Sequence, residues 1–255
     1  MRQGLVRVHR WTGLVAGLYL FAIGLSGSVL AFRPELQARL FPQFFTVPHT
    51  GAPTASETTV AASVRARYPG YRYGVIEPPT AARNTFRTFV AQGDVIETVF
   101  ADPYSGEVIG ALPREGWLYS VQELHYNLLL GRPGIPLNGV GAASLVLMSV
   151  TGFAVGFGRS GSRRIWELHR QAGLWSSAFL LMWGVTGVYF MFPAEIQALI
   201  GDGAAARTFL DWAGPLHMGT AAGLTTKILW CALGVALPLL FVTGTVLFTR
   251  RGFRL

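Results

Sequence analysis

Four long apolar stretches, separated by polar segments, dominate the hydrophobic pattern of the chain. Each lacks charged residues and reaches the length of about 20 residues that a membrane-spanning helix needs. They are Trp11–Phe32, Leu137–Phe157, Gln171–Phe192 and Ile228–Phe248. The first is longer than the apolar core of a signal peptide and is followed by no small-residue cleavage site, so we expect a retained helix. The pattern predicts four transmembrane helices.

The polar segment between the first two stretches shows a different pattern. Glu57–Arg67 is predicted as a short helix that ends before Pro69-Gly70. The alternation of apolar and polar residues predicts strands at Tyr71–Glu77, Thr85–Ala91, Val95–Ala101 and Glu107–Ala111, with Gln92-Gly93-Asp94 as a hairpin connection. After this small α+β module, Trp117–Leu130 has the spacing of an amphipathic helix. The loop Pro193–Pro215 is predicted to be short and exported.

The predicted fold is therefore an all-α integral membrane protein with a small inserted α+β domain. We divide it into transmembrane helix 1 (residues 1–36), the inserted domain (37–115), the amphipathic helix with transmembrane helix 2 (116–159), transmembrane helix 3 (160–195) and a short loop with transmembrane helix 4 (196–255).

Composition and charge agree with this picture. The chain is 51% hydrophobic and 13% charged, whereas soluble domains carry about 25% charged residues. The net charge of +8 is concentrated beside the apolar stretches, at Arg2, Arg7 and Arg10, at Arg159, Arg163, Arg164 and Arg170, and at Arg250, Arg251 and Arg254. The positive-inside rule then places both termini and the 159–170 loop in the cytoplasm, with residues 33–136 largely exported. The excess of basic residues thus reflects the membrane topology, and we expect no nucleic-acid partner.

The candidate cofactor ligands of the chain lie in an internal repeat. The stretch that begins at His9 recurs from His169, and nine of 28 aligned positions are identical. A second stretch, from Leu124-His125 to Thr151-Gly152, recurs from Leu216-His217 to Thr243-Gly244. Four of the five histidines therefore occupy repeat-matched positions, and the four helices are predicted to be two duplicated pairs.

These four histidines suggest cofactor ligands. Two neutral imidazoles from facing helices bind haem iron and make a six-coordinate electron carrier. His9 with His169 would hold one haem b near the cytoplasmic face, and His125 with His217 a second near the exported face. Two such haems would let an electron cross from one face of the membrane to the other. The alternative for any single histidine is an interfacial residue without a metal.

Other residues refine the prediction. Arg10, Arg170 and Arg132 are candidate partners of haem propionates, or else anchors of helix ends. The glycines of the spans either make room for a macrocycle or allow close helix packing. The single cysteine, Cys231, excludes covalent c-type haem attachment and a thiolate iron–sulfur cluster. Because the chain has no dinucleotide or P-loop motif, a quinol or a separate cytoplasmic reductase would have to supply electrons.

At this point the chain resembles the PepSY-associated transmembrane family, which includes iron-regulated proteins and ferric-siderophore reductases of the bacterial inner membrane. The resemblance covers nearly the whole chain, and its carriers are His9–Leu14, Ser26-Gly27, Phe32–Glu35, Val99–Gly106, Leu124-His125, Thr151-Gly152, His169-Arg170, Leu216-His217 and Thr243-Gly244. It implies a PepSY-like periplasmic domain, haem b held by the four histidines, and an oxidoreductase that reduces a ferric siderophore in the periplasm to release Fe(II).

Two other functions fit the same sequence. The first is a membrane-anchored PepSY binding or regulatory module without redox activity, for which the histidines would be dispensable. The second is a haem subunit that serves another periplasmic reductase. His49 has no repeat mate, and it is either solvent-exposed or a contact for an iron-bearing substrate.

Overall fold

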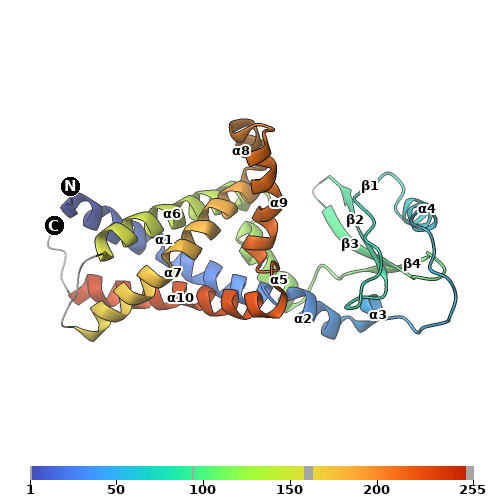
Figure 1. Ribbon diagram of the computed structural model, residues 1–255, viewed down its shortest axis with the longest axis horizontal. Coiled ribbons are helices and arrows are strands. Elements are labelled where there is room, and N and C mark those ends of the chain that lie inside the picture. The colour runs from blue at the N-terminus through green and yellow to red at the C-terminus, as the bar shows by residue number, and fades with distance from the viewer. Residues whose placement is uncertain (1, 94, 158–162, 251–255) are drawn as a thin grey trace. The chain divides into compact units, whose positions relative to one another are not determined.

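The computed structural model describes residues 2–93, 95–157 and 163–250. The chain separates into two compact units, one formed by Met1–Phe32 with Ser120–Leu255 and the other by Arg33–Tyr119. Figure 1 shows the elements of both. The first unit is helical, and the second contains a small antiparallel sheet.

Four helices of the first unit are long and apolar enough to cross a membrane. They are α1 (Arg2–Leu30), α6 (Gly134–Gly156), α7 (Arg164–Met191) and α10 (Gly223–Arg250). Helices α1 and α7 begin well before the predicted Trp11 and Gln171, because each helix continues through arginine-bearing turns that an apolar pattern leaves out. The fold class is thus mostly helical with four candidate spans, as predicted.

The packing of the spans follows their sequence matches. The most extensive contacts are α6 with α7 and α1 with α10, followed by α1 with α6 and α7 with α10. Since α1 matches α7 in sequence and α6 matches α10, each of these contacts has a counterpart. The core of the unit is a cluster of four buried leucines, one from each span, at matched positions: Leu20, Leu145, Leu180 and Leu237.

Shorter helices connect the spans. Helix α5 (Trp117–Asn127) precedes α6, while α8 (Pro193–Ile200) and α9 (Ala204–Met218) lie between α7 and α10. The predicted loop Pro193–Pro215 is therefore mostly helical. Helix α5 ends three residues before the predicted Leu130, where Leu128 and Leu129 adopt positive φ angles of 59° and 62°.

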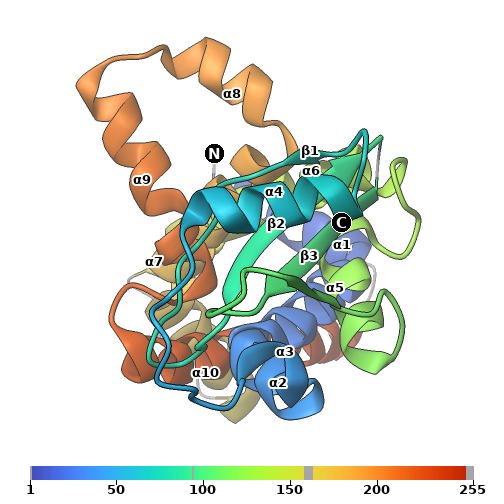
Figure 2. The ribbon, with the colours of Figure 1, turned by 90° about the vertical axis from the view of Figure 1, so that its right-hand side faces the viewer.

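The second unit begins with α2 (Arg33–Leu40) and α3 (Pro42–Phe45), followed by α4 (Glu57–Arg67). Its sheet has the order β1-β2-β3-β4, all antiparallel, with β1 (Arg72–Tyr73), β2 (Phe86–Gln92), β3 (Val95–Ala101) and β4 (Val108–Ala111). Helix α4 lies over one face of the sheet (Figure 2). The two pack around a core that includes Val60, Val64, Phe86, Val90 and Val99.

Local signals explain which predictions in this unit match the structure. The side chain of Ser56 accepts a hydrogen bond from the Thr59 N–H and so caps α4, whose bounds are those predicted. Strand β3 also has its predicted bounds. The predicted strand Tyr71–Glu77 is regular only over two residues, and Glu77 then makes an isolated bridge to Arg87. The predicted hairpin connection includes residue 94, which lies outside the described residues.

Candidate cofactor site

The helical unit brings four histidines together as two pairs. The imidazole centroids of His9 on α1 and His169 on α7 are 6.4 Å apart, with an angle of 75° between the ring planes. Those of His125 on α5 and His217 on α9 are 6.3 Å apart, with an angle of 62°. These are the two pairings that the sequence predicted.

The separation within each pair has a simple chemical meaning. A direct N–H···N hydrogen bond would put the centroids about 5 Å apart, from a bond of about 2.9 Å and about 1.1 Å from each nitrogen to its ring centre. One metal ion in line between two imidazole nitrogens gives about 6.2–6.4 Å, because each metal–nitrogen bond is about 2.0–2.1 Å long. Both observed separations match the second arrangement.

Each imidazole is held by a hydroxyl group on a neighbouring helix. The Nδ1–Oγ distances are 3.0 Å for His9 with Thr151, 2.9 Å for His125 with Ser26, 2.8 Å for His169 with Thr243 and 2.7 Å for His217 with Thr186. All four hydroxyl-bearing residues are at most 4% exposed, so water does not compete for these groups.

The direction of these hydrogen bonds follows from the hydroxyl protons. Each hydroxyl donates to the carbonyl four residues earlier in its own helix, at 2.6–2.8 Å. A hydroxyl has one proton, so toward the imidazole its oxygen acts as an acceptor and Nδ1–H is the donor. A neutral imidazole with a proton on Nδ1 keeps an unprotonated Nε2, which is the form that binds a metal.

A glycine follows each of these hydroxyl-bearing residues, and three of the four face an imidazole closely. A Cβ atom added at Gly152 would lie 2.9 Å from Cε1 of His9, one at Gly27 would lie 3.1 Å from Cε1 of His125, and one at Gly244 would lie 3.2 Å from Cε1 of His169. The fourth, Gly187, is farther away, at 3.8 Å from Cε1 of His217. These glycines therefore make room for imidazole rings.

Other glycines have the packing role that was the alternative in the sequence. A Cβ at Gly24 would lie 2.6 Å from the carbonyl oxygen of Gly234, and one at Gly184 would lie 2.9 Å from the backbone nitrogen of Val146. Both contacts are with backbone atoms of an adjacent helix. Some glycines of the spans thus make room for imidazoles, and others let helices approach closely.

Side chains on the following spans fix the ends of the two short helices that carry His125 and His217. On α6, Asn138 donates to the carbonyls of His125 (2.8 Å) and Tyr126 (3.0 Å), which fixes the end of α5. At the matched position of α10, the indole N–H of Trp230 donates to the carbonyl of Leu216 (2.6 Å), next to His217. Two different side chains at matched positions thus donate to the end of the histidine-bearing helix in the two halves of the repeat.

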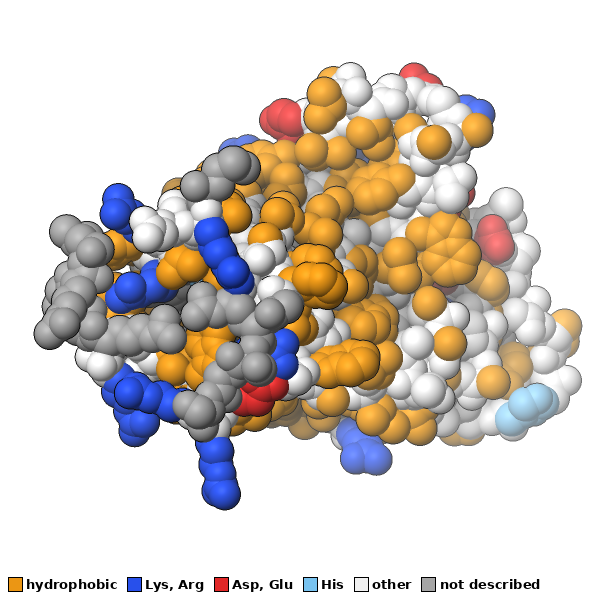
Figure 3. Space-filling view, turned by 60° about the vertical axis from the view of Figure 1, so that its left-hand side comes forward, with side chains coloured by type: hydrophobic (Ala, Val, Ile, Leu, Met, Phe, Trp, Pro, Cys, Tyr) orange, Lys and Arg blue, Asp and Glu red, His pale blue; other side chains and the backbone are white. Residues whose placement is uncertain are grey.

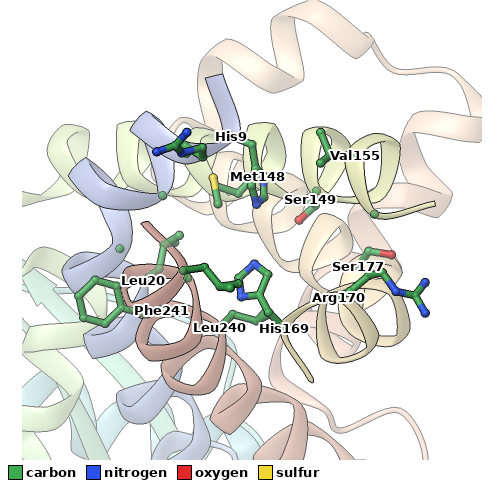
Figure 4. Close-up of a pocket in the computed structure, with 18 of the residues that line it drawn as sticks. His9, Leu20, Met148, Ser149, Val155, His169, Arg170, Ser177, Leu240 and Phe241 are labelled. Atoms are coloured by element: carbon green, nitrogen blue, oxygen red, sulfur yellow. The ribbon is translucent and has the colours of Figure 1, made fainter. Parts of the chain in front are cut away.

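A cavity lies at the pair formed by His9 and His169. Its lining includes both imidazoles, Arg10, Met148 and Phe241, and most of the other lining residues are apolar or glycine. Figure 4 shows His9 and His169 pointing toward one another across it. An apolar space with two facing metal-binding nitrogens suits a large flat cofactor that brings its own metal.

The two pairs occupy different levels of the helical unit. Along α1, His9 and the hydroxyl partner of His125, Ser26, are 17 residues apart (26 − 9), or about 25 Å at 1.5 Å per residue. Leu20, the member of the leucine cluster on α1, lies between His9 and Ser26 in the sequence. The pairs are therefore two sites and do not form one.

The three candidate arginines have different surroundings. The guanidinium of Arg10 lies 4.9 Å from the ring centre of Phe248 and lines the cavity. Arg170 also lines the cavity, but its guanidinium pairs with Glu167, with 3.0 Å from Nε to Oε2, and points away from the imidazoles (Figure 4). Arg132 lies in the exposed turn between α5 and α6.

Burial keeps His125 and His217 neutral. It lowers the pKa of His125 to about 4, where a hydrogen bond to the backbone of Ile23 offsets part of the shift. It lowers the pKa of His217 to about 3, and the nearby His125 lowers this pKa further. Neutral imidazole is the form that binds metals. His49, in the other unit, is exposed and accepts a hydrogen bond from the Gly51 N–H (3.1 Å).

A bare metal ion fits the described residues less well. Within residues 2–93, 95–157 and 163–250, no group of three or more His, Cys, Asp or Glu side chains could hold an ion. Pairs of imidazoles instead suit a metal whose remaining ligands come from a macrocycle.

The four hydroxyl-bearing residues and Asn138 are features that the sequence reasoning missed. Thr151 and Thr243 are identical at matched positions, and Ser26 and Thr186 are chemically alike. The signal was a Ser/Thr–Gly dipeptide at matched positions of the four spans, at 26, 151, 186 and 243, whereas a further dipeptide of this kind, Thr12-Gly13, has no matched counterpart. These dipeptides served to align the repeat and to carry the family resemblance, but their hydroxyl groups were given no role.

Comparison with known proteins agrees with this architecture. The model of the family described as the PepSY-associated TM region matches residues 6–206 and again residues 199–251. No curated protein matches the chain. The chain is thus a multi-pass membrane protein, and it belongs to the PepSY-associated TM region family.

Proposed function

We propose that this protein is an oxidoreductase that carries electrons across the membrane through two haem b groups and reduces a ferric chelate on the exported side. The observation that carries the proposal is the geometry of the two histidine pairs. Their centroid separations of 6.4 and 6.3 Å leave room for one metal ion between two imidazoles. The hydroxyl partners leave Nε2 of each ring free.

His9 and His169 would hold the inner haem, and His125 and His217 the outer one. Iron ligated by two imidazoles has no free coordination position, so haem b held in this way supplies one-electron transfer without binding the substrate at the metal. The protein orients the four rings and excludes water with the leucine cluster. Arg10 and Arg132 are placed near the ends of spans, where they would pair with propionates. Arg170 already pairs with Glu167, so its guanidinium would have to bind that carboxylate and a propionate at the same time.

The finer architecture is part of the same proposal. We infer that the four spans are two duplicated helix pairs, into which a PepSY-like domain is inserted after the first span. The matched contacts between helices and the matched His–hydroxyl bonds support this arrangement.

The proposed orientation puts both termini in the cytoplasm of a bacterial cell and residues 33–136 largely in the periplasm. Basic side chains gather at the end of the helical unit where α1 and α7 begin, beside a broad apolar surface (Figure 3). The described ones include Arg2, Arg7, Arg10, Arg163, Arg164 and Arg170. Arg159, Arg251 and Arg254 lie outside the described residues. This charge at one end supports the orientation through the positive-inside rule.

The proposed substrate is a ferric siderophore, and the proposed electron donor is a quinol or a separate cytoplasmic reductase. Reduction of Fe(III) to Fe(II) weakens the hold of oxygen-donor chelators on iron, so a one-electron carrier that opens to the periplasm has a direct chemical use there. The same carrier would also serve as a subunit of another periplasmic reductase.

A reduction assay tests this function. The detergent-purified full chain is reduced with dithionite, freed of excess reductant under anaerobic conditions, and mixed with a ferric hydroxamate chelate and a colorimetric Fe(II) trap. We expect Fe(II) in proportion to the reduced protein, and none from His125→Ala or His217→Ala. A wild-type protein that carries haem but yields no Fe(II) would favour the subunit of another reductase. Variants indistinguishable from a haem-free wild type would favour the binding module.

A further inference from the structure

We propose that Ser26, Thr151, Thr186 and Thr243 are positioning residues that fix each histidine in the tautomer with a proton on Nδ1, so that Nε2 is directed at the metal. The inference rests on the proposed function, because it concerns the metal that the histidine pairs would hold. Each of these four residues contacts Nδ1 of its histidine, so they act through the histidines.

The hydroxyl groups suit this role because they only accept toward the imidazole. A neutral imidazole carries its proton on either nitrogen, and only a ring with an unprotonated Nε2 presents that nitrogen to a metal. An amide partner would offer both a donor and an acceptor, and would allow either tautomer. A buried hydroxyl whose proton is committed to the carbonyl four residues earlier offers only a lone pair.

The contact with histidine is not a general property of serine and threonine in these helices. Ser144 on α6 donates to the Gly141 carbonyl at 2.6 Å, and Ser176 on α7 donates to the Ala172 carbonyl at 2.6 Å. These hydroxyls bond to their own helix without facing an imidazole. The four positioning residues are distinguished by their contact with an imidazole, and the glycine that follows each of them opens space for the ring beside the hydroxyl.

The arrangement is repeated where the sequence is not identical. Ser26 and Thr186 occupy matched positions of α1 and α7, and they bind His125 and His217 at 2.9 and 2.7 Å. The side chains differ by one methyl group, yet the hydrogen bond is the same. What the two halves share is thus the hydroxyl acceptor, which is what the proposed role requires.

Two measurements test the proposal on the full chain. The first is ¹⁵N NMR of the haem-free protein in bilayers, with ¹⁵N-labelled histidine, which reports the protonated nitrogen of each ring. The second is the haem content, haem affinity and reduction potential of Thr243→Val, with Thr243→Ser as rescue and Ser144→Ala as a control that loses a hydroxyl on a span. Thr151→Val removes the hydroxyl partner of His9, and so perturbs the pair of His9 and His169 through its other imidazole.

We expect the four paired histidines to carry their neutral proton on Nδ1. We also expect Thr243→Val to weaken haem binding at the inner site about tenfold or more, the range for loss of a hydrogen-bond partner behind a metal ligand. Its inner-site potential should rise, because an imidazole that loses its hydroxyl acceptor and keeps only the backbone of Leu240 is less basic. Thr243→Ser should restore both, and Ser144→Ala should change neither.

The proposal is overturned if the paired histidines carry their proton on Nε2, or if Thr243→Val keeps the wild-type haem affinity and potential. Failure of the proposed function looks different, since the wild type would then bind no haem at all. In that case the NMR result alone decides. Protons on Nδ1 in the wild type, with the His169 tautomer lost in Thr243→Val, would support the positioning role, and an unchanged tautomer would overturn it.

Discussion

Gly152→Ala should weaken haem binding while leaving the stability of the haem-free chain nearly unchanged. The added Cβ would lie 2.9 Å from Cε1 of His9, and ordinary contact begins at 3.4 Å. The ring must therefore move by about 0.5 Å (3.4 − 2.9), a displacement at which a designed or natural site loses its productive geometry. The bond from Nδ1 to Thr151, now 3.0 Å, would stretch toward about 3.5 Å, the limit for a hydrogen bond.

Two opposing effects then act on the free energy of unfolding. Weakening one hydrogen bond costs about 1 kcal/mol, while alanine is favoured over glycine in a helix interior by about the same amount. The midpoint of thermal unfolding of the haem-free chain should thus change little. Haem affinity at the inner site should still fall about tenfold, because the ligand is displaced.

The assay is haem titration of purified protein together with a thermal melt of the haem-free chain. Gly4→Ala is the matched control, since a Cβ there meets no atom within 4 Å. It should leave haem binding unchanged. If Gly152→Ala binds haem as tightly as the wild type, the close fit between this glycine and His9 has no role in ligand placement, and the reasoning is refuted.

Four further predictions follow from the same structure. His169→Ala should reduce the haem content from two per chain to one, by pyridine haemochrome assay, and equal loss of both haems would contradict two separate sites. Gly24→Ala should destabilise the helical unit by about 1–3 kcal/mol, measured by thermal unfolding, because its Cβ meets the backbone of α10 at 2.6 Å. In the haem-free chain, burial lowers the pKa values of His125 and His217 to about 4 and 3. The unfolded chain binds their protons first, so stability should be fully present above pH 6.5 and fall as the pH drops toward 4; a pH series of melts without this loss would count against neutral buried rings. Phe86→Ala should cost the sheet-containing unit about 3–5 kcal/mol and expose it to protease, while haem content stays unchanged.

The membrane fold could be predicted because hydropathy reports burial in lipid directly. The four spans follow from runs of about 20 uncharged residues, and their ends are less accurate because a helix does not stop at the lipid boundary. Helices α8 and α9 were missed for a different reason. Helix α8 begins at Pro193 and α9 contains Pro215, and the glycines at 201 and 203 between them are typical of a loop.

The sheet was predicted where side chains alternate without interruption. Strands β2 and β3 pair over seven residues each, from Phe86 opposite Ala101 to Gln92 opposite Val95. Strand β1 is shorter than predicted, because Gly74 has no side chain to pack and the chain leaves the regular ladder after Tyr73.

The pairing of histidines could be predicted because it depends on repeat symmetry alone. The hydroxyl acceptors could not, since a match by residue identity passes over Ser26 opposite Thr186. Their role depends on which helix faces which, and only the packing of α1 against α6 and of α7 against α10 brings Thr151 to His9 and Thr243 to His169.

The most direct test of the central claim is an optical spectrum of the detergent-purified wild-type chain, recorded oxidised and then reduced with dithionite, with haem quantified per chain. Two imidazole pairs predict a sharp low-spin reduced spectrum with resolved α and β bands and two haems b per chain. A protein without a Soret band after expression with ample haem would contradict the proposal that the histidine pairs hold haem.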